Sequence, residues 1–469
     1  MIQREEAAHQ SGVAGSDMNP ADRYSNRALI RFFLPILAFN LIEVGFGVID
    51  TIWVGILLEA GAIGATSICL SVTLILLGLA SGIATAATVL VARSFGAHDT
   101  DHITRLVENA FGFSLLFAGI LTAAGIYAGD RIVDIMGTPA SIRAMTHEYL
   151  ILSFITFFFT CAATTVVGIL RGIGDSKTPM KFMMIGAILN TILVPLLITG
   201  LGPFPRMGLN GSMVATLLAT LVALSLAIAY IYRSNGYPPI QVRRLALDIP
   251  VVRSLMAIGM PSVIQNCIPP LTGALLMAFV TPFGTDMVDM FGAVRKVDSM
   301  ALLPALSMGT ALSVFVSQLL GKKASQPIFS LFRFSCLFMA AISAMVSLAV
   351  IVFSPQLLSL FGLGDRSGIV EGMRYLTIAG SFYICQGIMA TANGVLIGAG
   401  KTASAMLTSF TSQFCLTGLA LLVIRNTGLG IHTIWWTIAF SSIAGMGMTL
   451  VLYYRKTWLE SHTSSLVPG

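Results

Sequence analysis

The chain has 469 residues, of which 56% are hydrophobic and only 10% are charged, and its formal net charge is +6. With a mean hydropathy of +0.86, this composition lies outside the range of soluble globular proteins and indicates an integral membrane protein. Nucleic-acid binding would require a soluble basic domain, which the chain lacks, so we expect no nucleic-acid partner.

Long apolar segments follow one another along the chain. Backbone groups in hydrocarbon must be hydrogen-bonded internally, so such segments cross the membrane as helices, and each crossing needs about 20 residues. Twelve windows meet this length, near residues 32–56, 66–92, 108–128, 148–170, 181–201, 211–232, 261–283, 290–319, 330–353, 376–398, 403–425 and 432–454. The sequence therefore predicts an all-α membrane protein with twelve transmembrane helices.

Basic residues are distributed unequally between the loops. Most of the 27 Lys and Arg residues lie in the two terminal segments, 1–26 and 456–469, and in the loops on the same side as these termini. Because Lys and Arg are retained in cytoplasmic loops, we expect both tails to be cytoplasmic. The expected location is a bacterial-type inner cell membrane.

The second half of the chain repeats the first at an offset of 225 to 226 residues. Three segment pairs match: RALIRFFLPILAFN (27–40) with RSLMAIGMPSVIQN (253–266), ATVLVARSFGA (87–97) with LSVFVSQLLGK (312–322), and GILRGIGDSKT (168–178) with GVLIGAGKTAS (394–404). Each repeat holds six spans, an even number, so the halves share one orientation, as in the parallel repeats of secondary transporters.

The repeat divides the chain into two predicted lobes. We expect an N-lobe over 27–232 and a C-lobe over 253–455, joined by a polar, proline-bearing cytoplasmic loop at 233–252. Two similar six-helix bundles of this kind would face each other across a central cleft, where such transporters bind their substrates.

Two acidic residues lie inside the first span. Glu43 and Asp50 are seven residues apart, about 10 Å along a helix, and they share one face with Asn40 and Gly47. Intramembrane acids are costly, turn inward and mark ion or proton paths. The alternative for either residue is a neutral carboxyl group that only hydrogen-bonds two helices together.

The eighth span carries the charges Arg295 and Asp298. Three residues apart, they can pair on one helix face. The pair either stabilises the C-lobe or forms a polar wall of the substrate cleft. Further candidate cleft residues are the polar side chains of other spans: Asn40, Gln265, Asn266, Tyr383, Gln386, Asn393 and Gln413.

No pattern in the chain indicates a cofactor or a metal. The six cysteines lie in apolar spans and the six histidines lie in tails, loops or span ends, in both cases without metal-ligand spacing. The segment GVLIGAGKT (394–402) resembles a P-loop, but its first glycine is one residue too early. We therefore expect no cofactor and no enzyme activity.

Several motifs in order resemble those of the MATE (multidrug and toxic compound extrusion) family, in its DinF-like or NorM-like branch within the wider oligosaccharide flippase superfamily. They are GFGVIDT (45–51), LVARSFGA (90–97), LRGIGDSKTPM (170–180), LN (189–190), GLNGSMVAT (208–216) and VRKVDSMALLPALSMG (294–309). The resemblance implies a two-lobed antiporter that exports organic, often cationic, compounds in exchange for protons or sodium.

The resemblance also implies roles for individual residues. Asp50 falls on the family's cation-coupling aspartate of span one, and Asn190 and Thr216 match positions that line the same site. Glu43 is then a candidate proton relay. Two positions depart from the family's pattern, because Val194 and Pro269 stand where sodium-coupled or archaeal members carry an acid. This favours H⁺ over Na⁺ as the coupling ion.

The sequence thus predicts a secondary antiporter of small amphipathic organic molecules that works as a monomer in lipid by alternating access. Two alternatives remain. A flippase for a lipid-linked saccharide would need a cationic cavity for phosphate, whereas Arg295 and Lys296 lie beside Asp298. A membrane-embedded transferase would need a metal-binding acidic cluster, for which Asp286 and Asp289 are insufficient.

Overall fold

The structure is a computed structural model that describes residues 24–58, 60–233, 247–360, 368–425 and 432–459. Within these ranges the secondary structure is helical and contains no strand. The chain forms two compact units, one that extends through Val263 and one that begins at Ile264. Among these residues, eleven helical segments are long and apolar enough to cross a membrane, with Thr285–Gly321 counted as one segment, in agreement with the multi-pass membrane protein expected from the sequence.

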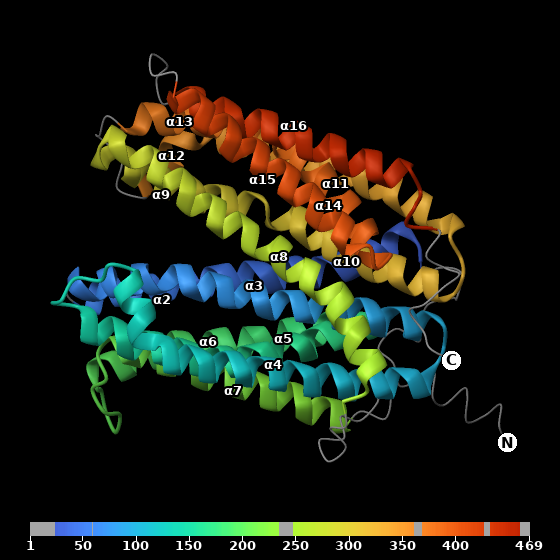
Figure 1. Cartoon of the computed structure of the whole chain (residues 1–469), viewed down its shortest axis with the longest axis horizontal. Coiled ribbons are helices and arrows are strands. Elements are labelled where there is room, and N and C mark those ends of the chain that lie inside the picture. The colour runs from blue at the N-terminus through green and yellow to red at the C-terminus, as the bar shows by residue number, and fades with distance from the viewer. Residues whose placement is uncertain (1–23, 59, 234–246, 361–367, 426–431, 460–469) are drawn as a thin grey trace. The chain divides into compact units, whose positions relative to one another are not determined.

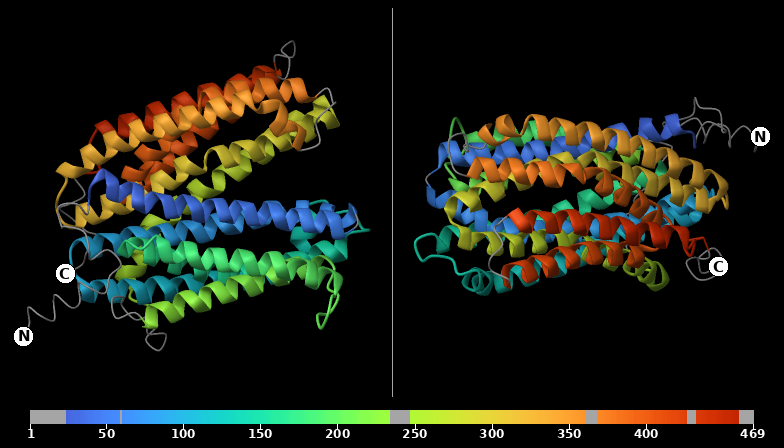
Figure 2. Two further views of the ribbon diagram at one scale, coloured as in Figure 1. Left: turned by 180° about the vertical axis from the view of Figure 1, so that it is seen from behind. Right: turned by 90° about the horizontal axis from the view of Figure 1, so that it is seen from above.

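The first unit is built from six long helices and the start of a seventh. These are α2 (Asn26–Leu57), α3 (Ala60–Gly96), α4 (Thr100–Ile135), α5 (Arg143–Ile173), α6 (Lys177–Thr199), α7 (Leu209–Arg233) and the first part of α8 (Ile249–Val280). Helix α5 packs on α3, α4 and α7, while α6 packs on α2 and α7. The helices run side by side along their length (Figure 1), and the pair α6 and α7 is visible from behind (Figure 2).

The second unit contains the rest of α8 and shorter pieces of helix. These are η2 (Thr281–Phe283), α9 (Thr285–Ala301), α10 (Leu303–Gly321), α11 (Gln326–Val352), α12 (Ser354–Leu360), α13 (Gly368–Ser381), α14 (Tyr383–Gly398), α15 (Thr402–Arg425) and α16 (His432–Tyr454). Helix α14 packs on α10, α11 and α16, and α15 packs on α16, as the view from above shows (Figure 2).

The two units repeat one helix arrangement, which confirms the internal repeat. Ala60 and Thr285, which begin α3 and α9, are 225 residues apart, and so are Arg143 and Gly368, which begin α5 and α13. The contacts correspond as well, since α3 with α5 is matched by α10 with α14, and α6 with α7 by α15 with α16.

Glycines allow the central helices of each unit to touch through their backbones. A Cβ atom on Gly172 of α5 would lie 2.9 Å from the Thr88 carbonyl oxygen of α3, and one on Gly309 of α10 would lie 2.7 Å from the Ala390 carbonyl oxygen of α14. Membrane helices associate through such small residues, because lipid offers no hydrophobic force to hold them together. A matching hydroxyl bond crosses each seam, from Thr88 to the Gly168 carbonyl oxygen at 3.0 Å and from Ser317 to the Gly398 carbonyl oxygen at 2.8 Å.

Two of the twelve predicted spans are broken. The span predicted near 290–319 is interrupted at Leu302 between α9 and α10, and the span near 376–398 is interrupted at Phe382 between α13 and α14. The corresponding helices of the first unit, α3 and α5, are continuous. The second unit therefore contains two joints that the first does not have.

The junction between the units lies within α8. Its first part packs against the first unit, where a Cβ on Gly82 of α3 would lie 2.6 Å from the Val263 backbone nitrogen. The Asp248 N–H, just before α8, donates to Asn109 Oδ1 of α4 at 2.6 Å. Most of the predicted inter-lobe loop, residues 234–246, lies outside the described residues.

Candidate functional site

The first unit brings three predicted site residues into one polar cluster. Asp50 of α2 accepts a hydrogen bond from Ser212 Oγ of α7 at 3.3 Å. One turn further along α7, Thr216 Oγ1 donates to the Ser212 carbonyl oxygen at 3.1 Å and accepts from Asn190 Nδ2 of α6 at 3.0 Å. The cluster therefore ties α2, α6 and α7 together through polar side chains.

The cluster is buried among apolar side chains. Asn190 is 1% exposed and Ser212 is fully buried, while Asp50 and Thr216 are half-buried. Val194, one turn after Asn190, is fully buried as well. Since polar groups in such surroundings are stable only when hydrogen-bonded, the side chains of Asn190 and Thr216 hold each other in place, and the Ser212 hydroxyl holds Asp50.

Asp50 is only partly satisfied by this network. Its Oδ1 atom is buried and has no hydrogen-bond partner among the described residues, which costs about 1–3 kcal/mol for a buried polar atom. Tyr149 of α5 interacts with the Ser212 side chain and lies within electrostatic reach of Asp50. The carboxyl group thus keeps one oxygen free to bind a proton or a small cation.

Sequence reasoning missed Ser212 and Tyr149. Ser212 lies one turn before Thr216 on the same helix face, so its position in the segment GSMVAT gave a usable signal. No such signal marks Tyr149, because it begins a long apolar run of α5 that predicts only a buried helix.

Glu43 does not join the Asp50 cluster. It is exposed and lies within electrostatic reach of Arg171, although no hydrogen bond or ion pair between the two side chains is found in the described part of the chain. Arg171 is in the last turn of α5, with its guanidinium 4.5 Å from the centre of the Phe39 ring. The Nε and Nη2 atoms of Arg171 are buried and unpartnered within the same residues. Arg171 lies two residues before the end of α5, where the sequence suggests a charge that faces solvent, but it packs inside the first unit.

The predicted Arg295–Asp298 ion pair is not formed among the described residues. Asp298 of α9 instead accepts hydrogen bonds from two tyrosine hydroxyls, Tyr375 of α13 at Oδ2 and Tyr383 of α14 at Oδ1. Arg295 lies within electrostatic reach of Asp298. The tyrosines bond the buried carboxyl group in place of Arg295 because they reach it from two other helices, whereas Arg295 projects from one turn earlier on α9. Tyr375 had not been predicted.

The remaining polar candidates of the second unit mostly join helices in pairs. Each donates or accepts one bond: Gln265 to Ser409 at 3.2 Å, Gln386 to Ser442 at 3.1 Å, and Asn393 from Thr408 at 2.8 Å. Asn266 and Gln413, and Asn40 of the first unit, are half-buried. The three bonds of Gln265, Gln386 and Asn393 have no residue in common.

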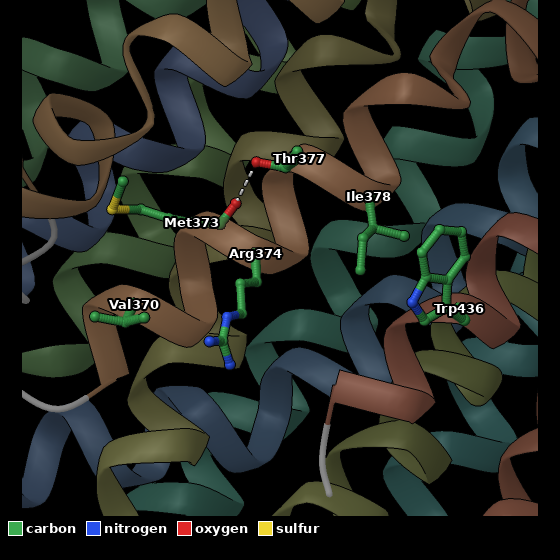
Figure 3. A pocket seen from close by; sticks show the side chains of 6 residues that line it. All are labelled: Val370, Met373, Arg374, Thr377, Ile378 and Trp436. Carbon is green, nitrogen blue, oxygen red and sulfur yellow. Dashed lines mark hydrogen bonds between the residues drawn. The ribbon is translucent and has the colours of Figure 1, made fainter.

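Two hollows are lined by residues other than the acidic ones. One, of about 710 Å³, is lined by Val370, Met373, Arg374, Thr377 and Ile378 of α13 and by Trp436 of α16 (Figure 3). The other, of about 370 Å³, is an apolar groove between α2 and α6. In the described part of the chain, no group of three or more His, Cys, Asp or Glu side chains gathers that could hold a metal ion.

Comparison with known proteins identifies the family. The MatE family model matches twice, at residues 35–196 and 261–423. The two matches begin 226 residues apart, which is the offset of the internal repeat. Together they cover more than half of the chain.

Relatives match along most of the chain. It is 26% identical over 453 residues to the probable multidrug resistance protein YoeA of Bacillus subtilis, covering 94% of this chain and 96% of YoeA. It is 28% identical over 348 residues to an FAD transporter of Shewanella oneidensis, covering 71% of this chain and 74% of that protein. A solved transporter of the MOP superfamily from Pyrococcus furiosus shares the fold with a TM-score of 0.86 and 20% identity, covering 94% of this chain and 97% of its own.

Proposed function

Because this chain belongs to the MatE family, we propose that it is a secondary antiporter that exports small amphipathic, often cationic, organic compounds in exchange for protons. The observation that carries this proposal is the half-satisfied Asp50 carboxyl group in the first unit. A buried acid with one oxygen already bonded and one free can take up and release a proton, as acids inside membrane spans do in pumps and transporters.

The surroundings of Asp50 favour a proton over sodium as the coupling ion. In transporters, Na⁺ is coordinated by several oxygens, typically including carbonyls of unwound helices. Helices α2, α6 and α7 are continuous where Asp50, Asn190 and Ser212 lie, so the carbonyls of these three residues are used within the helices. Val194 has no side-chain oxygen that could coordinate Na⁺. A proton needs only the one carboxyl group.

Ethidium transport in everted membrane vesicles tests the proposal. In such vesicles, efflux from the cell corresponds to movement into the vesicle. We expect a proton gradient to drive ethidium movement through the wild-type protein. A sodium gradient of equal size should drive no ethidium movement. Movement driven only by sodium would overturn the choice of ion. A complete lack of movement with either gradient, for ethidium and for other lipophilic cations, would overturn the proposed substrate class.

Glu43 and Arg171 form the second element of the proposed proton path. Glu43 shares the face of α2 that leads to Asp50, about two helical turns away. The two unpartnered atoms of Arg171, Nε and Nη2, form the edge of a guanidinium that binds a carboxylate bidentately. We infer that Glu43 pairs with this edge when it is ionised and leaves it when it carries a proton.

Glu43→Gln is therefore expected to slow proton-driven efflux roughly tenfold, less than the loss of an essential proton-transfer group. The amide can neither release a proton nor neutralise Arg171. The initial rate of ethidium efflux measures the effect. Adding Arg171→Gln to the Glu43→Gln variant should lower the efflux rate little further, because the two side chains act as one unit.

Thr104→Ala provides the control, because this hydroxyl bonds only within its own helix, to the Thr100 carbonyl oxygen at 3.1 Å. Additive losses for Glu43→Gln and Arg171→Gln would contradict the pairing.

Transport of an anion is the second candidate. The unpartnered guanidinium edge of Arg171 also fits a phosphate or carboxylate, the class of group that a lipid-linked saccharide carries and that the relative named as an FAD transporter would have to accommodate. Inhibition of ethidium efflux by FAD, lost in Arg171→Gln, would favour it.

The proposal includes the arrangement of the chain. We place an N-lobe at 27–232 and a C-lobe at 253–455, with both termini in the cytoplasm and the protein in the cell membrane. We further propose that a single chain surrounded by lipid carries out transport.

A further inference from the structure

The second unit contains a buried acid that the proposed function does not use. Asp298 of α9 is 7% exposed, and each of its oxygens accepts a hydrogen bond from a tyrosine, Tyr375 of α13 and Tyr383 of α14. Arg295, one turn earlier on α9, interacts with both Asp298 and Tyr375. The carboxyl group thus links three separate helices of the same unit.

This link bridges the break between α13 and α14. The Asp298 carbonyl oxygen accepts from the Leu302 N–H at 3.0 Å, at the joint between α9 and α10. Tyr383 is the first residue of α14, directly after the break at Phe382. Interrupted helices in transporters occur at sites that bind ions or substrate, and the unbroken α3 and α5 of the first unit carry no such acid.

Other contacts hold the tyrosine and arginine of this cluster in position. Trp435 of α16 stacks on Phe291 with ring centres 6.0 Å apart and meets Tyr375 edge-on at 5.0 Å. A Cβ on Gly273 of α8 would lie 3.1 Å from Arg295 Nη2, so the guanidinium packs against the helix backbone. Such tight surroundings leave the hydroxyl hydrogens as the part of the cluster that moves most easily.

Few other ionisable groups face Asp298 from the neighbouring helices. Helices α10 and α12 carry none, and Cys385 of α14 lies two residues after Tyr383, about 200° around the helix from it. Those of α11, Arg333 and Cys336, lie more than about 20 Å along the axis from Val350, where α11 meets the apolar core around α9. On α13, Glu371 is bonded to Arg374 at 2.6 Å and to Trp435 at 3.4 Å. Arg295, Tyr375 and Tyr383 are therefore the groups that set its charge state.

Protonation changes what this cluster can bond. An ionised carboxylate only accepts, so it satisfies both tyrosine hydroxyls as donors. When a proton binds, one oxygen becomes a donor, and the tyrosine on that oxygen must turn its hydroxyl to accept or lose the bond. Because Tyr383 belongs to α14 and Tyr375 to α13, either change alters the connection across the Phe382 joint.

We propose that Asp298 is a second proton-binding site of this transporter, and that its protonation loosens the joint between α13 and α14. The proposal rests on the proposed proton antiport. It assigns the two units different tasks, since the first contains the Asp50 site on unbroken helices and the second contains an acid bonded to both sides of the joint between α13 and α14.

Hydrogen exchange of the purified full-length protein, without any substrate, tests the joint directly. The amides to follow are those of Phe382 and Gln386, which bond to the Ala379 and Phe382 carbonyl oxygens. After correction for the intrinsic pH dependence, we expect exchange to become roughly tenfold faster from alkaline to acidic pH, the factor that corresponds to the loss of one hydrogen bond to a charged group.

Two variants locate the effect. Asp298→Asn should remove the pH dependence, and Tyr383→Phe, which keeps the acid and the fold of the ring, should exchange fast at every pH. Asp99→Asn, at the exposed start of α4, is the matched control and should behave as wild type. A wild-type joint that does not respond to pH, or an Asp298→Asn joint that still responds, would overturn the proposal. If Asp298→Asn does not fold, Tyr383→Phe provides the test. Slow, pH-dependent exchange at the joint of Tyr383→Phe would also overturn the proposal.

Proton release on ethidium binding in weakly buffered solution separates this inference from the proposed function. We expect Asp298→Asn to release fewer protons than wild type but still some, since Asp50 and Glu43 remain as exchanging acids. Unchanged release would count against Asp298. A wild-type protein that releases no protons would refute the antiport instead, and the exchange experiment would still decide whether Asp298 controls the joint.

Discussion

Asp50→Asn is expected to reduce proton-driven ethidium efflux to the level of vesicles that lack the transporter. The substitution preserves size, and the new amide oxygen can still accept the hydrogen bond from Ser212. It removes only the ability to bind and release a proton, so the fold should remain while the coupling is lost. Initial efflux rates under an imposed proton gradient measure the effect.

The matched control is Asp99→Asn. Asp99 caps α4 by accepting the His102 N–H at 2.9 Å, and Asn caps helices equally well, so this variant should keep the wild-type rate. Ser212→Ala should give an intermediate loss, because it removes one hydrogen bond, worth about 1 kcal/mol, and leaves the acid. Efflux by Asp50→Asn at the wild-type rate would make Asp50 a structural residue and remove the basis of the proposed coupling.

Gly394→Leu is expected to destabilise the second unit by at least about 3 kcal/mol, at or above the upper end of ordinary overpacking costs. A Cβ at Gly394 of α14 would overlap the Gly309 carbonyl oxygen of α10 and lie 3.0 Å from the Gly309 Cα, a contact between two backbones that cannot yield as a side chain does. The two helices would have to separate along the seam that Ser317 and Gly398 also share. Thermal unfolding of the purified protein measures the change.

Gly447→Leu is the control for this prediction. Gly447 lies inside α16, with no atom within 4 Å of where its Cβ would be, so Leu should raise stability by up to about 1 kcal/mol through helix propensity. Equal melting temperatures for the Gly394 and Gly447 variants would show that the close approach of α10 and α14 contributes nothing.

The sequence predicts most of the architecture because lipid imposes a simple rule. Each span must be apolar and helical over about 20 residues, so hydropathy locates all twelve segments, and the repeat follows from glycines such as Gly172 and Gly398 that recur at one offset. The breaks at Leu302 and Phe382 escape this reasoning. Pro304 gives a weak signal for the first, whereas the second has only Gly380 two residues before Phe382, and glycines are common in membrane helices.

The candidate site was predictable where the residue type itself is costly in lipid. Asp50 and Asp298 stand out because an acid inside a span requires a reason, and Asn190 and Thr216 came from the family resemblance. The residues that interact with these side chains were harder to predict. Tyr149 and Tyr375 are amphipathic residues that suit any buried helix face, and Arg171 lies so near a helix end that its sequence position does not distinguish a loop charge from a packed one.

The most direct test of the proposed antiport uses purified protein in liposomes with a pH-sensitive dye inside and no ion gradient. An imposed ethidium gradient should drive protons in the opposite direction, so that the internal pH changes with wild type and stays constant with Asp50→Asn. Ethidium movement through the wild-type protein without any change in internal pH, or only in the presence of sodium, would contradict proton-coupled export.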